Sequence, residues 1–255
     1  MTEPVAEMRE WGLVSPAELE RVVILSPHLD DAVLGCGRFM AEHPGATVVT
    51  VYAGAPRVYP DPMTHWDRLA GFRAGDDVLA ERRAEDARAL AELHATPYWL
   101  DFVEHQYLER PDWVGPDQTA ATIESTLRAL APTAVFMPFG LANPDHDATH
   151  AAAIRVRTAL TEPAWFAYED FGYKHIPGLL AWRVGGLFRA GLWPTPAAVT
   201  VETSDVAKSA ALGHYRSQIR ALEADWTLTP KLVAPEQLWR LEPPPSGWEG
   251  LSATT

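Results

Sequence analysis

Two clusters of histidine and aspartate follow apolar stretches of the sequence, and they are the residues best suited to chemistry. The first cluster carries His28, Asp30 and Asp31 directly after the apolar run at residues 22–25. An imidazole and two carboxylates beside apolar neighbours are costly to bury unless a cation neutralises them. The simplest such cation is a divalent metal ion, so this cluster is a candidate metal site.

The second cluster follows the apolar run at residues 134–138 and contains Asn143, Asp145, His146 and His150. Both apolar runs are typical of buried strands. Ligands bind at the carboxyl ends of strands in open α/β sheets, so we expect the two clusters to meet in one site. A single His-x-x-Asp pattern is more often a helix cap beside a surface carboxylate, but two clusters at two strand ends favour a metal.

The elements that position these clusters alternate regularly between strands and helices. This pattern predicts the α/β class, with a Rossmann-like, mostly parallel sheet covered by helices on both faces. No Gly-x-Gly-x-x-Gly follows the first strand, so a dinucleotide cofactor is not indicated. The expected strands are residues 22–26, 46–53, 98–102, 134–138, 165–168 and 198–202. The expected helices are residues 31–43, 78–93, 117–130, 147–160 and 204–224.

We expect a single domain at residues 21–242, preceded by a polar leader at residues 1–20 and followed by a flexible tail at residues 243–255. The loops at residues 56–75 and 104–116 are rich in aromatic residues. Long loops of this kind border a binding site or are disordered, and we favour the first interpretation for residues 56–75.

A further segment, residues 172–196, breaks the alternation and contains glycines and aromatic residues. It is either a wall of the substrate site or an oligomer surface, and a homo-oligomer is left open.

Composition restricts the partners and the location. The formal net charge of −13 and the absence of basic runs argue against a nucleic-acid partner. No stretch approaches the ~18 consecutive apolar residues of a membrane span, and the N-terminus lacks the apolar segment of a secretory signal. The single cysteine, Cys36, excludes an internal disulfide and is expected to pack in the core. We therefore expect a cytoplasmic protein without a membrane partner.

Together the two clusters resemble the motifs of the PIG-L/LmbE family of zinc-dependent N-deacetylases, of the N-acetylglucosaminyl deacetylase type. The family's first motif, His-Pro-Asp-Asp-Glu, is similar to residues 28–32, and its second, His-Pro-Asp-His, to residues 143–146. Similar features continue in the family's order across residues 22–222. They are Arg82 with Glu85, residues 168–170, residues 208–212 and residues 215–218.

The resemblance implies a Zn²⁺ ion bound by His28, Asp31 and His146, with an open position for water. Asp30 matches the family's general base, and its side chain diverges from that of its neighbour Asp31, so the two do not easily share the ion. Asp145 matches a residue that orients a metal ligand or the base.

The sequence departs from the family pattern at two positions. Asn143 stands where the family has a histidine that helps to stabilise the tetrahedral oxyanion, and asparagine can donate a hydrogen bond but carries no charge. Either zinc takes more of this stabilisation or another histidine has the charged role. We rank His175 first because it follows the fifth strand. The other candidates are His65, His105 and His150. Ala32 replaces the motif glutamate without loss of a ligand.

Arg82 matches an arginine that contacts substrate in relatives. The alternative is a helix-surface ion pair with Glu85 or Asp86, since these residues lie three and four positions further along the expected helix.

The resemblance implies hydrolysis of an N-acyl amide, and an N-acetyl amide above all, on an amino sugar or glycosylated small molecule. One alternative is an amidase of the same fold that acts on a non-sugar or thiol-conjugate amide. The other is a catalytically weak relative that binds a metal and a sugar. Retention of Asp30 argues against the weak relative, because a binding protein has no need of the base.

Overall fold

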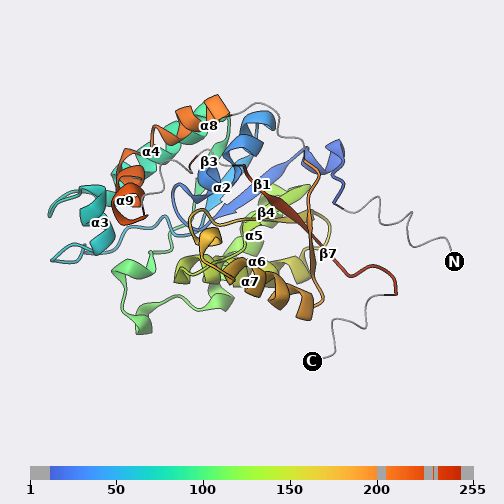
Figure 1. Cartoon of the computed structure of the whole chain (residues 1–255). Helices are drawn as coiled ribbons and strands as arrows, with labels where there is room; N and C mark the ends of the chain where they lie inside the picture. Colours follow the sequence, from blue (N-terminus) through green and yellow to red (C-terminus); the bar gives the residue numbers. More distant parts are fainter. Residues whose placement is uncertain (1–11, 200–204, 227–231, 233–234, 248–255) are drawn as a thin grey trace.

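The middle layer of the structure is a mixed β-sheet with helices on both faces (Figure 1). The structure is a computed structural model and describes residues 12–199, 205–226, 232 and 235–247. The strands are β1 (Val22–Ser26), β2 (Thr47–Thr50), β3 (Thr96–Trp99), β4 (Ala134–Pro138), β5 (Ala164–Tyr168), β6 (Trp193–Pro196) and β7 (Leu238–Glu242). They lie in the order β3-β2-β1-β4-β5-β7-β6. Strands β1 to β5 pair in parallel, and β7 pairs antiparallel with β5 and β6, so the predicted α/β class and mostly parallel sheet are confirmed.

Two hydrophobic cores lie on the two faces of the sheet. The helices are α2 (Asp31–Glu42), α3 (His65–Ala70), α4 (Val78–Glu92), α5 (Pro116–Leu130), α6 (Pro144–Ala159), α7 (Leu179–Arg189), α8 (Asp205–Leu212) and α9 (Arg216–Trp226). Short 3-10 turns occur at η1 (Pro16–Leu19), η2 (His105–Tyr107), η3 (Arg110–Asp112) and η4 (Tyr173–His175). Successive side chains of a strand point to opposite faces. Val22 and Ile24 accordingly join the core with α2, α4 and α8, whereas Val23 and Leu25 join the core with α5, α6 and α7.

Helix α6 begins three residues earlier than predicted. Asn143 is its N-cap, with the side-chain oxygen accepting a hydrogen bond from the Asp145 backbone N–H at 2.8 Å. Pro144 occupies the first helical position, where its missing N–H has no helical acceptor to lose. The early start places Asp145 and His146 in the first turn of the helix.

Helix α2 is interrupted at Cys36, where φ is −134° and ψ is 15°. Backbone groups lose their helical partners at such an interruption. The Glu236 carboxylate accepts hydrogen bonds from two N–H groups of the second half of the helix, at 2.8 and 3.1 Å. Lys208 Nζ donates to the Leu34 carbonyl oxygen of the first half and to Glu236 Oε1, both at 2.7 Å. Two distant segments thus stabilise the helix that begins at Asp31.

The single helix predicted at residues 204–224 is wrong, because the structure has two helices, α8 and α9. Gly213 follows the last residue of α8, and the chain turns there before Arg216 begins α9. Glycine is unfavourable inside a helix, which explains a break at this position. Residue 204 lies outside the described residues.

Four strands also differ from prediction. The second strand covers Thr47–Thr50, not residues 46–53. The third strand covers Thr96–Trp99, not residues 98–102; Pro97 is tolerated because β3 is at the edge of the sheet. In the region of the predicted strand 198–202 the structure has β6, at residues 193–196, and residues 200–202 lie outside the described part. Strand β7 is absent from the prediction.

The described part of the predicted leader packs on the domain. Leu13 forms a β-bridge with Ala198, and Arg240 in β7 donates to the Leu13 carbonyl oxygen at 3.1 Å. Residues 1–11, and residues 248–255 of the predicted tail, lie outside the described residues.

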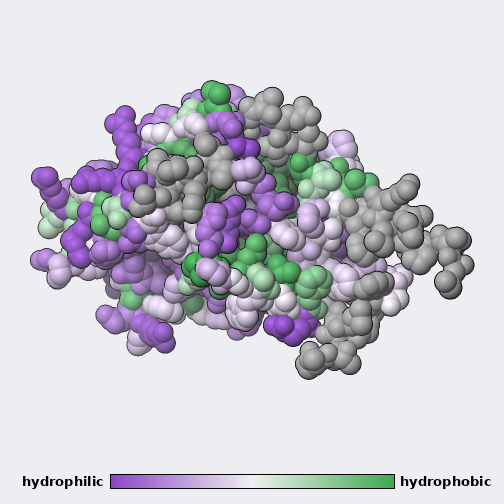
Figure 2. Space-filling model, viewed as in Figure 1, coloured by the Kyte–Doolittle hydropathy of each residue, from purple (hydrophilic) through white to green (hydrophobic). Residues whose placement is uncertain are grey.

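The two aromatic loops contain short helices: α3 lies within residues 56–75, and η2 and η3 lie within residues 104–116. Figure 2 shows that the surface over α3 and α4 is mostly hydrophilic. Among the described helices, none has the length and apolar character needed to cross a membrane.

Candidate metal centre

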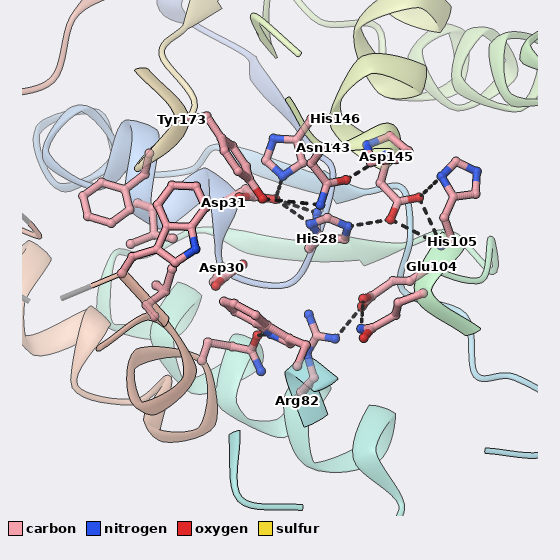
Figure 3. Close-up of a pocket in the computed structure, with 18 of the residues that line it drawn as sticks. His28, Asp30, Asp31, Arg82, Glu104, His105, Asn143, Asp145, His146 and Tyr173 are labelled. Atoms are coloured by element: carbon pink, nitrogen blue, oxygen red, sulfur yellow. Dashed lines mark hydrogen bonds and ion pairs between the residues drawn. The ribbon is translucent and has the colours of Figure 1, made fainter. Parts of the chain in front are cut away.

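Side chains of His28, Asp31 and His146 converge where β1 and β4 end (Figure 3). One ligand atom from each residue lies within 4.8 Å of the others. Asp31 Oδ2 is 3.2 Å from His28 Nδ1 and 3.2 Å from His146 Nε2. His28 lies in the turn after β1, Asp31 begins α2 and His146 is in the first turn of α6. These elements meet because β1 and β4 are adjacent parallel strands, whose carboxyl ends share one edge of the sheet.

A carboxylate holds the far side of each imidazole ring. His28 Nε2 lies 3.0 Å from Asp145 Oδ2, and His146 Nδ1 lies 2.5 Å from Asp170 Oδ1. Such contacts orient a ligand ring and fix which nitrogen faces the ion. In the sequence, Asp170 stands out only as part of the family-like segment at residues 168–170. Its contact with His146 is not predicted there.

The electrostatics of the centre favour positive charge between the three side chains. Burial lowers the pKa of His146, but the Asp31 charge and the Asp170 hydrogen bond outweigh it and raise the pKa to about 9. Burial also acts to lower the pKa of His28, yet Asp145 and Asp31 raise it well above its ordinary value. Burial acts to raise the pKa of Asp31, and the two histidines nevertheless hold it below its ordinary value. A bound cation would replace the protons that these groups otherwise attract.

The set of donors fits a divalent metal of the zinc type. Two imidazoles and one carboxylate are common ligands of catalytic zinc, which keeps a further position for water. In the described part of the chain, this is the one group of three such side chains close enough to hold an ion. His28, Asp31 and His146 would hold it.

Asp30 lines the adjacent cavity, and its side chain takes no part in capping α2. Its φ of 149° and ψ of −30° are strained for a residue with a Cβ, a condition that is frequent at functional sites. The side chain makes no capping hydrogen bond, although Asp30 is the N-cap residue. Burial and the Asp31 charge raise its pKa well above the ordinary value, against the opposing charges of Arg82 and His28. A raised pKa makes a carboxylate a stronger base, which favours its taking a proton from water.

Arg82 lies in α4 beneath the cavity and is only 2% exposed. Its guanidinium forms an ion pair with Glu104. The alternative expected from the sequence is not formed, because Glu85 accepts hydrogen bonds from Ser217 and Asp86 is occupied by Trp99 and a tyrosine. The sequence does not indicate that Glu104 is the ion-pair partner of Arg82.

The Asn143 amide is oriented by its role as helix cap. Because Oδ1 accepts from the Asp145 N–H, Nδ2 is left to donate, and it lies 3.4 Å from Tyr173 Oη. The Tyr173 ring packs edge-on against His146, with the ring centroids 5.3 Å apart. Burial raises the pKa of Tyr173, so its hydroxyl group keeps its proton at neutral pH. Asn143 and Tyr173 both line the cavity.

Of the four histidines considered as substitutes at the Asn143 position, only His105 lines the cavity. His105 Nδ1 lies 2.8 Å from Asp145 Oδ1, on the side of Asp145 away from the metal centre (Figure 3). His175 is exposed in η4, and the structure does not bring it to the cavity with the other residues. His150 is buried, with Nδ1 2.9 Å from the carbonyl oxygen at the end of β4, and His65 is exposed at the start of α3.

The cavity has a volume of about 390 Å³, within the usual range for small-molecule sites. It brings together the seven residues that match positions of the family's site, namely His28, Asp30, Asp31, Arg82, Asn143, Asp145 and His146. The residues that complete its lining are Leu34, Trp66, Glu104, His105, Gln106, Trp113, Pro144, Phe171, Tyr173, Gln218, Leu222 and Trp226. Both aromatic loops contribute, through Trp66 and Trp113.

Comparison with known proteins gives one family and a group of similar structures. A family model described as PIG-L, GlcNAc-PI de-N-acetylase, matches residues 23–157. A triple mutant of a deacetylase from the teicoplanin biosynthetic pathway is 24% identical, with a TM-score of 0.73, and the match covers 89% of this chain and 100% of that one. The A40926 pseudoaglycone deacetylase is 25% identical, with a TM-score of 0.71, and the match covers 88% of this chain and 97% of that one. The N,N'-diacetylchitobiose deacetylase from Pyrococcus horikoshii is 17% identical, with a TM-score of 0.55, and the match covers 88% of this chain and 84% of that one. No curated protein sequence matches the chain significantly.

The family match begins in β1 and ends in α6, so it includes both turns that supply the converging side chains. The likeness to the solved deacetylases extends the shared fold over 89% of the chain. Motifs, fold and site geometry agree with the resemblance found in the sequence: the chain belongs to the GlcNAc-PI de-N-acetylase (PIG-L) family.

Proposed function

We propose that the protein is a zinc-dependent N-deacetylase that removes an acetyl group from an amino sugar carried by a larger small molecule. The observation that carries this proposal is the convergence of His28, Asp31 and His146 beside Asp30 at one end of the cavity. Family membership supports de-N-acetylation. The similarity to the teicoplanin and A40926 pseudoaglycone deacetylases supports an amino sugar on a larger molecule.

A divalent cation at this centre would supply a Lewis acid that polarises a carbonyl oxygen and lowers the pKa of water. Another solved structure of similar fold is the zinc-inhibited form of teicoplanin deacetylase, with a TM-score of 0.69. Zinc is therefore a reasonable first metal to test, and it should be titrated from below one equivalent upwards.

Asp30 acts as the general base and then as the acid. Its carboxylate accepts a proton from the attacking water molecule as the C–O bond forms at the acetamide carbon. The same proton passes to the nitrogen as the C–N bond breaks, so the products are the free amine and acetic acid, which ionises to acetate in solution. The raised pKa of Asp30 supports this assignment, because it makes the carboxylate a stronger base toward water.

Asn143 and Tyr173 supply neutral hydrogen-bond donors to the developing oxyanion. The amide of Asn143 is fixed by its role as the cap of α6. The Tyr173 hydroxyl oxygen accepts a hydrogen bond from Asn143 Nδ2, which leaves the Tyr173 O–H free to donate into the cavity. Donors fixed before reaction stabilise an oxyanion without reorganisation. In this proposal Arg82 contacts sugar hydroxyl groups from the opposite side, and the charged role predicted for His175 has no place, because His175 does not line the cavity.

The proposal is tested by measuring amine release from methyl N-acetyl-β-glucosaminide and larger N-acetylglucosaminides, in parallel for the parent chain and for Asp30→Asn. We expect turnover by the parent and a loss of at least about 100-fold in kcat for the variant, with the bound metal retained. Equal turnover by the two proteins would exclude Asp30 as the base. An absence of hydrolysis across the series, with zinc bound, would contradict the proposed activity.

A further inference from the structure

One wall of the cavity is built from apolar side chains. We call it the α9 wall, and it consists of Leu34, Trp66, Phe171, Leu222 and Trp226. Leu222 and Trp226 are four positions apart in α9, so they project from one face of that helix. Trp66 comes from α3, which packs against α9.

The polar atoms of this wall are already used within the protein. Trp66 Nε1 donates to Gln218 Oε1 at 2.9 Å, and Gln218 Nε2 donates to Ser217 Oγ at 2.9 Å. Trp226 Nε1 donates to the Asp225 carboxylate. What remains for a ligand is ring faces, ring edges and methyl groups, which do not replace the hydrogen bonds of sugar hydroxyl groups with water.

Aromatic rings connect the α9 wall to the metal centre. The His146 ring meets the edge of Tyr173 with centroids 5.3 Å apart, and Tyr173 meets Trp226 at 5.0 Å and 79°. The apolar wall therefore begins beside a metal ligand, next to the position of the acetamide that is to be cleaved. A group bound there must be attached close to the amide nitrogen.

The opposite side of the cavity has the reverse character. It carries Arg82, Glu104, His105 and Gln106, and Figure 3 shows Arg82, Glu104 and His105 on the side of the site away from Tyr173. Glu104 accepts hydrogen bonds from Arg82 and from Gln106 Nε2, the latter at 2.6 Å. This side provides charged and amide groups for sugar hydroxyls.

Trp66 lines the cavity and also packs against the buried apolar cluster that includes Phe72, Val78 and Ala221. An apolar wall kept inside a cavity that also contains four carboxyl groups needs an apolar ligand group to cover it.

We infer that the substrate is an amphiphilic N-acyl amino sugar, in which an apolar, ring-containing group lies against the α9 wall while the sugar hydroxyls face Arg82 and Glu104. This inference rests on the proposed function for the position of the amide. The apolar group has two sources, an aglycone on the anomeric carbon or an aryl group in the acyl substituent. Both lie within a few bonds of the amide nitrogen.

The experiment measures dissociation constants by isothermal titration calorimetry, on the full chain with Asp30→Asn so that turnover adds no heat. The reference probe is methyl N-acetyl-β-glucosaminide. One arm uses 4-nitrophenyl N-acetyl-β-glucosaminide, with the ring on the anomeric carbon, and the other uses methyl N-benzoyl-β-glucosaminide, with the ring in the acyl group. We expect at least one aryl probe to bind about 10-fold or more tighter than the reference.

Two wall variants and one control decide where the preference originates. Trp226→Ala and Leu222→Ala should reduce the aryl preference to less than about threefold while leaving the affinity for the methyl reference within about twofold. Trp182→Ala removes an exposed tryptophan of α7 that does not line the cavity, and it should keep the full preference. Equal affinity for all three probes, or a preference that survives in both wall variants, would overturn the inference.

The outcome is separable from that of the proposed function. An aryl preference that depends on the α9 wall, without amine release by the parent chain, would support the inference and contradict the deacetylase activity. Amine release with equal kcat/KM from the methyl glycoside, the 4-nitrophenyl glycoside and the N-benzoyl glycoside would support the activity and overturn the inference.

Discussion

Lys208 and Glu236 form a buried ion pair at the interruption of α2, and removing one partner tests its role. The side chains are 1% and 3% exposed, and their nitrogen and oxygen are 2.7 Å apart. Lys208→Met would leave the Glu236 carboxylate in the interior without its countercharge and the Leu34 carbonyl without its donor. Breaking a buried ion pair in this way costs about 3–5 kcal/mol of unfolding free energy.

The measurement is equilibrium unfolding in urea. With a denaturant slope of about 2–3 kcal/mol per molar, Lys208→Met should lower the midpoint by about 1–2.5 M. The double variant Lys208→Met/Glu236→Gln should be more stable than Lys208→Met alone, because the neutral amide keeps a hydrogen-bond acceptor for the second half of α2 without a buried charge. A loss below about 1 kcal/mol in Lys208→Met, or strictly additive effects in the double variant, would refute this reasoning.

Three further predictions concern the site and its surroundings. His146→Ala should lose most of the bound metal, about one ion per chain in the parent, as measured by elemental analysis. Asn143→Asp keeps the helix cap, but its carboxylate accepts a hydrogen bond from the Tyr173 O–H instead of donating one to Tyr173, which draws that O–H away from the oxyanion. The kcat should therefore fall about 100- to 1,000-fold, as in Tyr173→Phe, with KM little changed in steady-state assays. Burial lowers the pKa of His150 to about 4. Between pH 6.5 and pH 4 the unfolded state therefore binds more protons at this residue than the folded state, and unfolding free energy falls by up to ~3 kcal/mol on acidification, measurable by urea titration at each pH.

Matched variants make these results interpretable. Tyr59→Phe removes a tyrosine hydroxyl that contacts the start of α4 and does not line the cavity, so it should leave kcat unchanged. Full metal content in His146→Ala would show that the motif containing His146 does not bind the metal together with the motif containing His28 and Asp31. Activity of Tyr173→Phe at the parent level would remove Tyr173 from the reaction. For His150→Gln, which cannot be protonated, the stability loss on acidification should shrink; an unchanged acid dependence would assign it to other groups.

The sequence predicts the elements that hold the metal ligands because their signals are local. An apolar β-branched run before a polar turn predicts β1, and the Asn-Pro pair marks the start of α6 once the side-chain cap is considered. The partners that orient the ligands come from elsewhere in the chain. Asp170 and Glu104 reach the site through tertiary packing, for which sequence spacing carries no signal.

Two differences have specific physical reasons. In a 3-10 turn, with three residues per turn, residues two apart point in different directions, so Tyr173 lines the cavity while His175 is exposed. Arg82, Glu85 and Asp86 share one face of α4, as an ion pair requires, but that face is buried and each residue has a tertiary partner. Local pairing rules hold on exposed helix surfaces and lose to tertiary contacts elsewhere.

The position of β7 has a consequence for the order in which the chain can fold. Residues 238–242 lie between β5 and β6, antiparallel to both, so β6 has no place in the sheet until a segment more than forty residues further along the chain arrives. The stretch that leads into β7 also carries Glu236, which completes α2 near the opposite end of the chain. Contacts of such long sequence separation form late and slow the folding of a domain. During synthesis, the five parallel strands can assemble first, and the helix that carries Asp31 gains its full support only when the last strand is added.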